Sequence, residues 1–190
     1  MKRVFIIHKW GGTPDSDWYQ WLKRELGQKG VQVFVPSMPD TGWPKIGQWV
    51  PYLFEMVGRV DEETYLVGHS MGCQAILRYL EGLGNGEEAG GALLVAGFVT
   101  VKKLSVNDEE YEIMRPWLET PIDMKAARKH AKAIVSIFSD NDPFVPLGDS
   151  DVFRNELGSE IVVMPKAGHF TSRDGYKELH VALNELMKML

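Results

Sequence analysis

The sequence predicts a three-layer α/β/α fold, with helices on both faces of a doubly wound parallel sheet of about six strands. Strand-like and helix-like segments alternate along the chain, without internal repeats or low-complexity linkers. The strand-like segments are continuously apolar, whereas a strand with one wet face would alternate between apolar and polar residues. Continuous apolar strands are typical of a parallel sheet that helices cover on both sides. Together these observations predict the doubly wound α/β class.

The expected strands are short apolar runs, and the expected helices are the longer segments between or after them. In chain order, the strands are RVFII at 3–7, VQVFV at 31–35, TYLV at 64–67, GALLVA at 91–96, AIVSIF at 133–138 and IVVM at 161–164. The helices are expected at 16–28, 44–58, 70–83, 147–157 and 172–189. In the third of these helices, apolar side chains recur at helical spacing, at Met71, Ala75, Ile76, Tyr79 and Leu80.

The segment 98–131 fits this rhythm least well, because it is charged and contains Pro116 and Pro121. It follows the fourth strand at its carboxyl end, where sites in such sheets are found, so we expect it to pass over or beside the site. Its part 98–124 has two interpretations that the sequence leaves open. It is either a lid over the site or a short helix that closes the flank of the sheet.

Composition limits the class of protein. A chain of 190 residues that is 44% hydrophobic can bury one core, so we expect a single domain over 1–190. The net charge of −5 argues against nucleic acid or an anionic membrane as the main partner. The single cysteine, Cys73, cannot form an internal disulfide, which fits a reducing compartment. The apolar runs are too short for a signal peptide or a membrane span, so we expect a cytoplasmic protein.

The stretch TYLVGHSMG at 64–72 places a serine between two glycines, directly after an apolar run and before a helical pattern. A G-x-S-x-G motif at a strand-to-helix turn is the pattern of a nucleophile elbow, in which a strained backbone holds the serine Oγ clear of the sheet. Ser70 is therefore the candidate nucleophile. The backbone N–H of Met71, at the start of the helix, is a candidate donor to an oxyanion.

A nucleophilic serine needs a base, and His169 is the favoured candidate. It follows Gly168 just after the sixth expected strand, in a loop that can fold back over the serine. His8 ends the first strand beside the expected oxyanion loop and is the weaker alternative. His69 lies inside the elbow but precedes the serine, so we expect it to pack or to hydrogen-bond locally.

Two acids after the fifth expected strand compete for the third role. Asp142 precedes Pro143, which biases it towards an extended backbone and lets its carboxylate project from the loop. Asp140 is better suited to a turn in which the side chain bonds its own backbone. We therefore favour Asp142. The resulting order along the chain, serine then aspartate then histidine, is that of the α/β-hydrolases.

Four aromatic residues are candidates for contact with a substrate, although aromatic side chains are also ordinary core residues. They are Trp10, Trp117, Phe144 and Phe170. The backbone N–H of Trp10 is also the candidate for the second oxyanion donor. No cofactor is expected. A metal-dependent hydrolase is disfavoured, because the histidines and acids show no H-x-x-x-H-type ligand spacing.

Landmarks spread over nearly the whole chain resemble those of a known family. They are WYQWLKREL at 18–26, PSMPD at 36–40, the elbow, RYL at 78–80, RPW at 115–117, NDPFVP at 141–146 and GHF at 168–170. The chain resembles the small serine hydrolases that include the retinoblastoma-binding-protein-9-like proteins, a compact branch of the α/β-hydrolases. The resemblance implies a minimal α/β-hydrolase fold, with Ser70 as nucleophile, Asp142 as acid and His169 as base. Relatives open the first loop with a glycine-rich run, whereas this chain has His8-Lys9-Trp10 before Gly11-Gly12.

Two hypotheses about function follow. The first is a serine hydrolase that cleaves short-chain acyl esters, or related amides, through an acyl-enzyme, with a small-molecule acyl compound as substrate. A chain of this length leaves no room for a large cap domain, so the site should be shallow and partly open. The alternative is a hydrolase-shaped protein-binding module with little or no activity, and the name of the family suggests a protein partner. Three reactive residues at three strand ends favour the enzyme.

Overall fold

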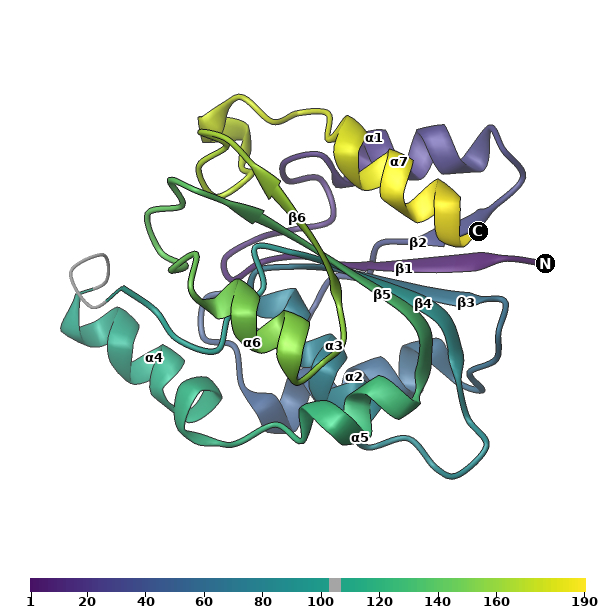
Figure 1. Cartoon of the computed structure of the whole chain (residues 1–190), viewed down its shortest axis with the longest axis horizontal. Helices are drawn as coiled ribbons and strands as arrows, with labels where there is room; N and C mark the ends of the chain where they lie inside the picture. Colours follow the sequence, from purple (N-terminus) through teal and green to yellow (C-terminus); the bar gives the residue numbers. More distant parts are fainter. Residues whose placement is uncertain (103–106) are drawn as a thin grey trace.

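The computed structural model describes residues 1–102 and 107–190 and contains one six-stranded sheet (Figure 1). The strand order is β2-β1-β3-β4-β5-β6, and every neighbouring pair is parallel. The strands are β1 (Arg3–Ile7), β2 (Gln32–Phe34), β3 (Thr64–His69), β4 (Ala89–Val95), β5 (Ala131–Ser139) and β6 (Glu160–Met164). The predicted doubly wound parallel sheet is thus confirmed.

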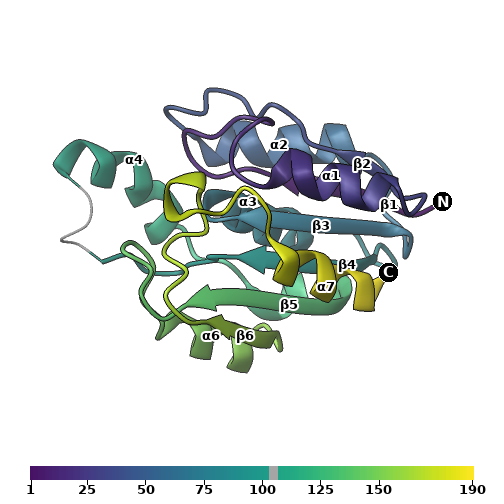
Figure 2. The same ribbon diagram turned by 90° about the horizontal axis from the view of Figure 1, so that it is seen from above.

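The helices lie on both faces of this sheet. They are α1 (Tyr19–Gly27), α2 (Ile46–Val57), α3 (Met71–Glu81), α4 (Asp108–Glu119), α5 (Met124–Lys129), α6 (Asp149–Asn155) and α7 (His180–Met189), with a 3₁₀ turn η2 (Ser172–Asp174). Helices α1 and α7 cover one face, in front of the sheet in Figure 2, and α2, α3, α5 and α6 lie on the other (Figure 1). None of the helices in the described ranges is long and apolar enough to cross a membrane.

Each face of the sheet has its own buried cluster of apolar side chains, because the strands are apolar on both sides. Under α1 and α7, Leu22 and Leu186 pack with Val67 of β3. On the opposite face, Trp49 and Leu77 pack with Leu66, also of β3. Alternate residues of one strand therefore serve the two clusters, which explains its continuous apolar sequence.

The expected C-terminal helix over 172–189 is wrong as a single element. The chain first makes the short turn η2, in which Thr171 and Asp174 bond each other in a capping box. Gly175 then adopts a left-handed conformation, with φ +94°, and ends the turn. Helix α7 begins only at His180. The break leaves the loop between β6 and α7 free to reach the carboxyl ends of the strands.

The described part of the segment 98–131 contains two helices, α4 and α5, whereas the sequence leaves a lid and one short flank-closing helix open for 98–124. Asn107 and Glu110 form a capping box that starts α4. At its other end, the buried guanidinium of Arg78 on α3 donates hydrogen bonds to the carbonyls of Trp117 and Thr120, at 2.9 and 2.7 Å. Helix α4 is thus tied to the core. Residues 103–106 of the segment 98–124, for which the sequence leaves both a lid and a flank-closing helix open, lie outside the described residues.

Candidate active site

The turn between β3 and α3 has the geometry of a strained elbow. Ser70 has φ 53° and ψ −113°, a conformation that side-chain-bearing residues rarely adopt. The glycines on either side are needed for close packing. A Cβ on Gly68 would lie 2.8 Å from the backbone of Cys73, and a Cβ on Gly72 would strike the carbonyl of Ile7. The elbow expected from the sequence is therefore present.

His169 and Asp142 are joined by a hydrogen bond of 2.7 Å between Nδ1 and Oδ2. The carboxylate of Asp142 is 2% exposed, and its other oxygen accepts the backbone N–H groups of Phe144 and Val145 at 2.8 and 3.0 Å. Because an ionised carboxylate only accepts, the Nδ1 atom of His169 donates to it, and a neutral ring bound in this way has its lone pair on Nε2. A general base requires this tautomer.

A set of parallel hydrogen bonds holds the loop of His169 against the loop that follows β5. The side chains at 139–142 bind successive residues of 166–169. The amide of Lys166 donates to Asp140 Oδ1 at 2.7 Å, that of Ala167 to Ser139 Oγ at 3.0 Å, and that of Gly168 to Asn141 Oδ1 at 2.8 Å. Asp140, the competing acid, is exposed, and its carboxylate is taken up by the hydrogen bond from the backbone N–H of Lys166. The roles of Ser139 and Asn141 were not predicted, although the polar run SDND directly after a strand is a signal for side chains that bind a neighbouring loop.

Ser70 and His169 line one pocket of about 830 Å³ at the carboxyl edge of the sheet. In the part of the chain that the structure describes, Ser70 Oγ makes no hydrogen bond with His169 Nε2. Such bonds are often long without substrate and tighten when it binds. The pocket therefore brings the candidate nucleophile and base to a shared space, in which a substrate can complete the contact.

Two of the expected substrate-contacting aromatics line this pocket. Phe144 is 39% exposed, and its ring meets the imidazole of His169 edge-on, with 5.1 Å between the centroids. Trp10 is half-buried, and its indole N–H donates to the carbonyl of Gly42 at 3.0 Å. The indole group is thus engaged by the protein. The role of the backbone N–H of Trp10 as an oxyanion donor stays a prediction, as does that of Met71.

The other two expected aromatics do not line the pocket, and this expectation is corrected. Trp117 is 1% exposed, donates its indole N–H to the carbonyl of Pro44 at 2.9 Å and packs against Trp49. Phe170 is fully buried in the cluster under α1 and α7. Both are core residues. From α4, the residues that do reach the pocket are Glu110 and Met114.

His8, the weaker candidate base, is committed to the fold. Its Nδ1–H donates to the carbonyl of Lys9 at 2.8 Å, and its Nε2 accepts the amide of Met38 at 3.1 Å. Burial lowers the pKa of His8 below its ordinary value. Both ring nitrogens are therefore occupied. Within the described ranges, no group of three or more His, Cys, Asp or Glu side chains is placed to hold a metal ion.

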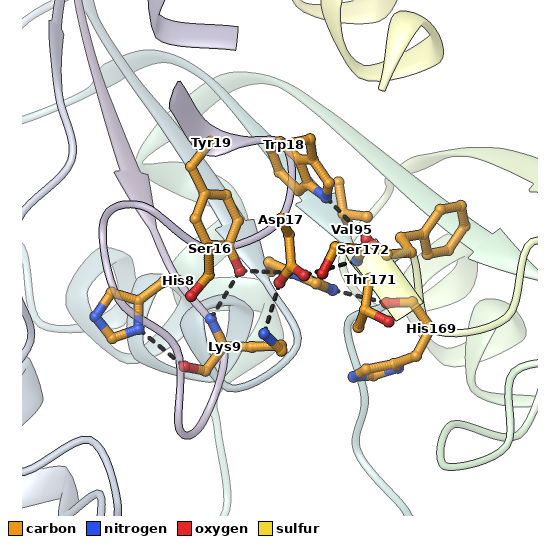
Figure 3. A network of polar contacts seen from close by, with 12 residues as sticks. His8, Lys9, Ser16, Asp17, Trp18, Tyr19, Val95, His169, Thr171 and Ser172 are labelled. Carbon is orange, nitrogen blue, oxygen red and sulfur yellow. Dashed lines mark hydrogen bonds and ion pairs between the residues drawn. The ribbon is translucent and has the colours of Figure 1, made fainter. Parts of the chain in front are cut away.

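A polar network beside the pocket joins the loop after β1 to the loop after β6 (Figure 3). Asp17 accepts Lys9 Nζ at 2.6 Å on one oxygen and the amide of Ser172 at 2.8 Å on the other. Burial raises the pKa of Asp17, but these two hydrogen bonds and the nearby charge of Lys9 together outweigh it and leave the pKa below its ordinary value. The ionised carboxylate thus acts as a bridge between two loops of the site.

Comparison with known proteins agrees with this geometry. The sequence model of the family described as Serine hydrolase matches residues 4–188. YdeN of Bacillus subtilis (strain 168) is 31% identical over 186 residues, which cover 97% of this chain and 94% of YdeN. Serine hydrolase RBBP9 of Rattus norvegicus is 25% identical over 191 residues, which cover 100% of this chain and 97% of RBBP9.

Solved structures share the fold over the whole chain. The crystal structure of the ydeN gene product from B. subtilis has a TM-score of 0.89 at 29% identity, covering 100% of this chain and 98% of that one. Est1E from Butyrivibrio proteoclasticus has a TM-score of 0.73 at 13% identity, covering 99% of this chain and 88% of that one. The expected family is thus confirmed. The chain belongs to the serine hydrolase family, and the protein is a hydrolytic enzyme with the α/β-hydrolase fold.

Proposed function

We propose that the protein cleaves short-chain acyl esters, or related amides, through an acyl-enzyme formed on Ser70, with His169 as base and Asp142 as acid. One observation carries the proposal. The ring of His169, oriented by a buried 2.7 Å hydrogen bond to Asp142, lines the same pocket as a serine in a strained elbow. The membership of the chain in the serine hydrolase family supports it.

The reaction follows from the hydrogen-bond directions. Ser70 Oγ attacks the acyl carbonyl while His169 Nε2 takes the hydroxyl proton and then delivers it to the leaving group. Asp142 keeps the proton of the imidazole on Nδ1 and stabilises the imidazolium that forms. A water molecule, deprotonated by the same nitrogen, then attacks the acyl-enzyme. The acid product leaves, and the serine regains its proton.

The negative charge of the tetrahedral intermediate needs donors near Ser70. Met71 follows the serine as the first residue of α3, so its N–H is among those without a partner inside the helix. The second donor in this proposal is the N–H of Trp10, in the turn that Gly12 closes with a hydrogen bond to the carbonyl of Lys9. Each donor contributes about 3 kcal/mol to transition-state stabilisation.

The lining of the pocket divides by chemistry, which bears on the substrate. The apolar lining comes from Trp10, Met114, Pro143 and Phe144. The polar lining comes mainly from the segments 15–17 and 171–174 and from Lys177. We place the acyl chain against the apolar residues and the leaving group towards the polar segments. The apolar part borders on solvent through the exposed Phe144, so it suits short chains better than long lipids.

The test is a panel of p-nitrophenyl esters from acetate to laurate, with an amide of the best acyl group added. We expect the highest kcat/KM for short acyl groups and a steep fall beyond medium chains. A preference for laurate or longer chains would contradict the proposed substrate class. Ser70→Ala serves as the control for background hydrolysis. Hydrolysis of the amide but of none of the esters would assign the other bond type.

A further inference from the structure

His69, the residue immediately before Ser70, is a buried histidine that the proposed mechanism does not use. Its side chain is fully buried, and its ring packs beside Trp18 and Tyr19 at the start of α1, with centroid distances of 5.6 and 5.8 Å. It also lies close to the imidazole of His169, at 5.4 Å between centroids. A polar ring in such a place needs partners for both nitrogens.

Both nitrogens of His69 have partners, and the partners fix its tautomer. Nε2 lies 2.8 Å from the backbone carbonyl of His169, and Nδ1 lies 2.7 Å from the hydroxyl of Tyr19. A carbonyl oxygen only accepts, so Nε2 carries the proton and Nδ1 accepts the O–H of Tyr19. Burial, reinforced by the nearby His169, lowers the pKa of His69 to about 3. The ring is therefore neutral at working pH and donates its single N–H, on Nε2, to the carbonyl of His169.

This hydrogen bond completes a clamp on the backbone of His169. The N–H of His169 donates to Asp174 Oδ2 at 3.1 Å, and its carbonyl accepts from His69. The side chain is held separately by Asp142. Because His69 directly precedes Ser70, the bond runs from the elbow itself to the residue that carries the base. It therefore fixes the distance between the backbone of the elbow, which carries Ser70, and the backbone of the loop that carries His169.

Tyr19 extends the connection to the loop after β1 (Figure 3). Its hydroxyl donates to His69 and accepts the backbone N–H of Lys9 at 3.2 Å. Lys9 directly precedes Trp10, whose N–H is the proposed second oxyanion donor. One buried phenol and one buried imidazole thus link the three loops that follow β1, β3 and β6.

We propose that His69 is a positioning residue, which holds the backbone of His169 in register with Ser70 through its Nε2–H bond, while Tyr19 orients its ring. The inference rests on the proposed function, because it assigns His69 a role through His169. It goes beyond packing, since an apolar side chain could fill the same space but could not bind the carbonyl of His169. A loss of this donor leaves that carbonyl unsatisfied and lets the base drift.

The test compares His69→Leu, which removes the donor, with His69→Gln, whose amide N–H can reach the same carbonyl. Kinetics with p-nitrophenyl acetate are measured at a temperature where circular dichroism shows each variant folded. We expect kcat and kcat/KM of His69→Leu to fall together by about 100-fold, as for a misplaced catalytic group. His69→Gln should restore most of this loss. In proton NMR, the low-field signal of the His169–Asp142 hydrogen bond should shift or broaden in His69→Leu only.

A matched control removes a buried hydroxyl away from the site. Ser159 bonds Ser136 at 2.7 Å, and Ser159→Ala should lower stability but keep kcat within about twofold and leave the low-field proton unchanged. Folded His69→Leu with nearly unchanged kcat would overturn the proposal. A His69→Gln variant as inactive as His69→Leu would overturn it too, because the donor would then not matter.

Tyr19→Phe keeps the test decisive if His69→Leu does not fold. It retains the ring and removes only the O–H, so His69 Nδ1 and the amide of Lys9 each lose a partner. A fall in kcat of about tenfold with little change in KM supports the proposal, and an unchanged kcat overturns it. The proposed function fails in a different way. Turnover that persists in Ser70→Ala would refute the nucleophile, whereas inactive Ser70→Ala together with fully active His69→Leu would refute only the positioning role.

Discussion

At the scale of single residues, Ser70 combines the proposed role of nucleophile with a strained backbone conformation. A non-glycine residue with φ near +53° stores about 1–3 kcal/mol of strain, which the surrounding structure must offset. Here the close packing of Gly68 and Gly72, and the bond from the Ser70 amide to the carbonyl of Val95 at 2.8 Å, hold the turn. The strain lifts the hydroxyl away from the sheet, towards the pocket that it lines.

Replacing either of the two acids after β5, Asp142 or Asp140, by asparagine should have clearly different effects on kcat. Asp142→Asn removes the acceptor that fixes the tautomer of His169, so we expect kcat to fall by about 10⁴-fold, with a small effect on KM. Asp140→Asn keeps an oxygen for the amide of Lys166 and should stay close to wild type. Steady-state kinetics of both variants check this. An active Asp142→Asn beside an inactive Asp140→Asn would show that the wrong acid has been assigned.

The buried histidines predict a stability that falls in acid. The pKa of His69 is lowered from 6.5 to about 3 in the folded protein, and that of His8 is lowered as well. Between these values the unfolded chain binds a proton that folded His69 does not, so the free energy of unfolding decreases as the pH falls below 6.5. The groups facing His69 are Lys9, Asp17, Tyr19 and His169.

Urea unfolding at a series of pH values measures this effect. Each such proton contributes a slope of up to about 1.4 kcal/mol per pH unit within the window. His69→Gln should flatten the dependence of the free energy of unfolding on pH between pH 6 and about 4. An equal slope in wild type and His69→Gln would mean that His69 takes up its proton in the folded state.

At the scale of the elements, the strands were predictable and some loops were not. The runs at 3–7 and 64–67 match β1 and most of β3. A continuously apolar run is typical of a strand that is buried on both faces of a parallel sheet, so such runs identify strands well. The helices near 98–131 and the break before α7 depend on capping boxes and on Arg78, contacts that periodicity does not reveal. The positions of most elements therefore followed from apolar periodicity, and the exceptions from polar contacts, namely two local capping boxes and the long-range hydrogen bonds of Arg78.

The same contrast holds for the candidate site. The elbow and the preference for Asp142 came from local backbone rules, glycines around a serine and a proline after an acid. Trp117 and Phe170 were misassigned, because nearness to a landmark in sequence does not say which way a side chain points. Tertiary packing turned Trp117 towards Trp49, and it placed Phe170 under α1 and α7.

On helix α4, Trp117 should therefore contribute to stability and not to substrate selectivity. Trp117→Ala removes a fully packed ring and its bond to Pro44, so we expect a loss of about 3–5 kcal/mol in the free energy of unfolding, with unchanged acyl preference. Phe144→Ala should do the reverse, altering chain-length preference with a stability change below about 1 kcal/mol. Denaturant unfolding and the ester panel test both. A stable Trp117→Ala variant with altered selectivity would restore the lid hypothesis.

At the scale of the whole molecule, the sheet order brings the candidate residues together. Strands β1 and β4 flank β3, and β5 and β6 continue the sheet on one side, so the loops after β1, β3, β5 and β6 meet at one edge. Two of these loops are bonded to each other by the side chains of 139–142, and two by Asp17. The site is thus built from chain segments about 160 residues apart, from Lys9 to His169, that only the fold makes neighbours.

The central claim is that Ser70 is the acyl-accepting nucleophile, and covalent labelling tests it most directly. The intact mass of the protein is measured after treatment with a fluorophosphonate, and the labelled peptide is then mapped. We expect one adduct, on Ser70, in the wild type, none in Ser70→Ala, and much slower labelling in His169→Ala, with all three proteins equally folded. An adduct on another residue, or hydrolysis of p-nitrophenyl acetate by Ser70→Ala at the wild-type rate, would contradict the account.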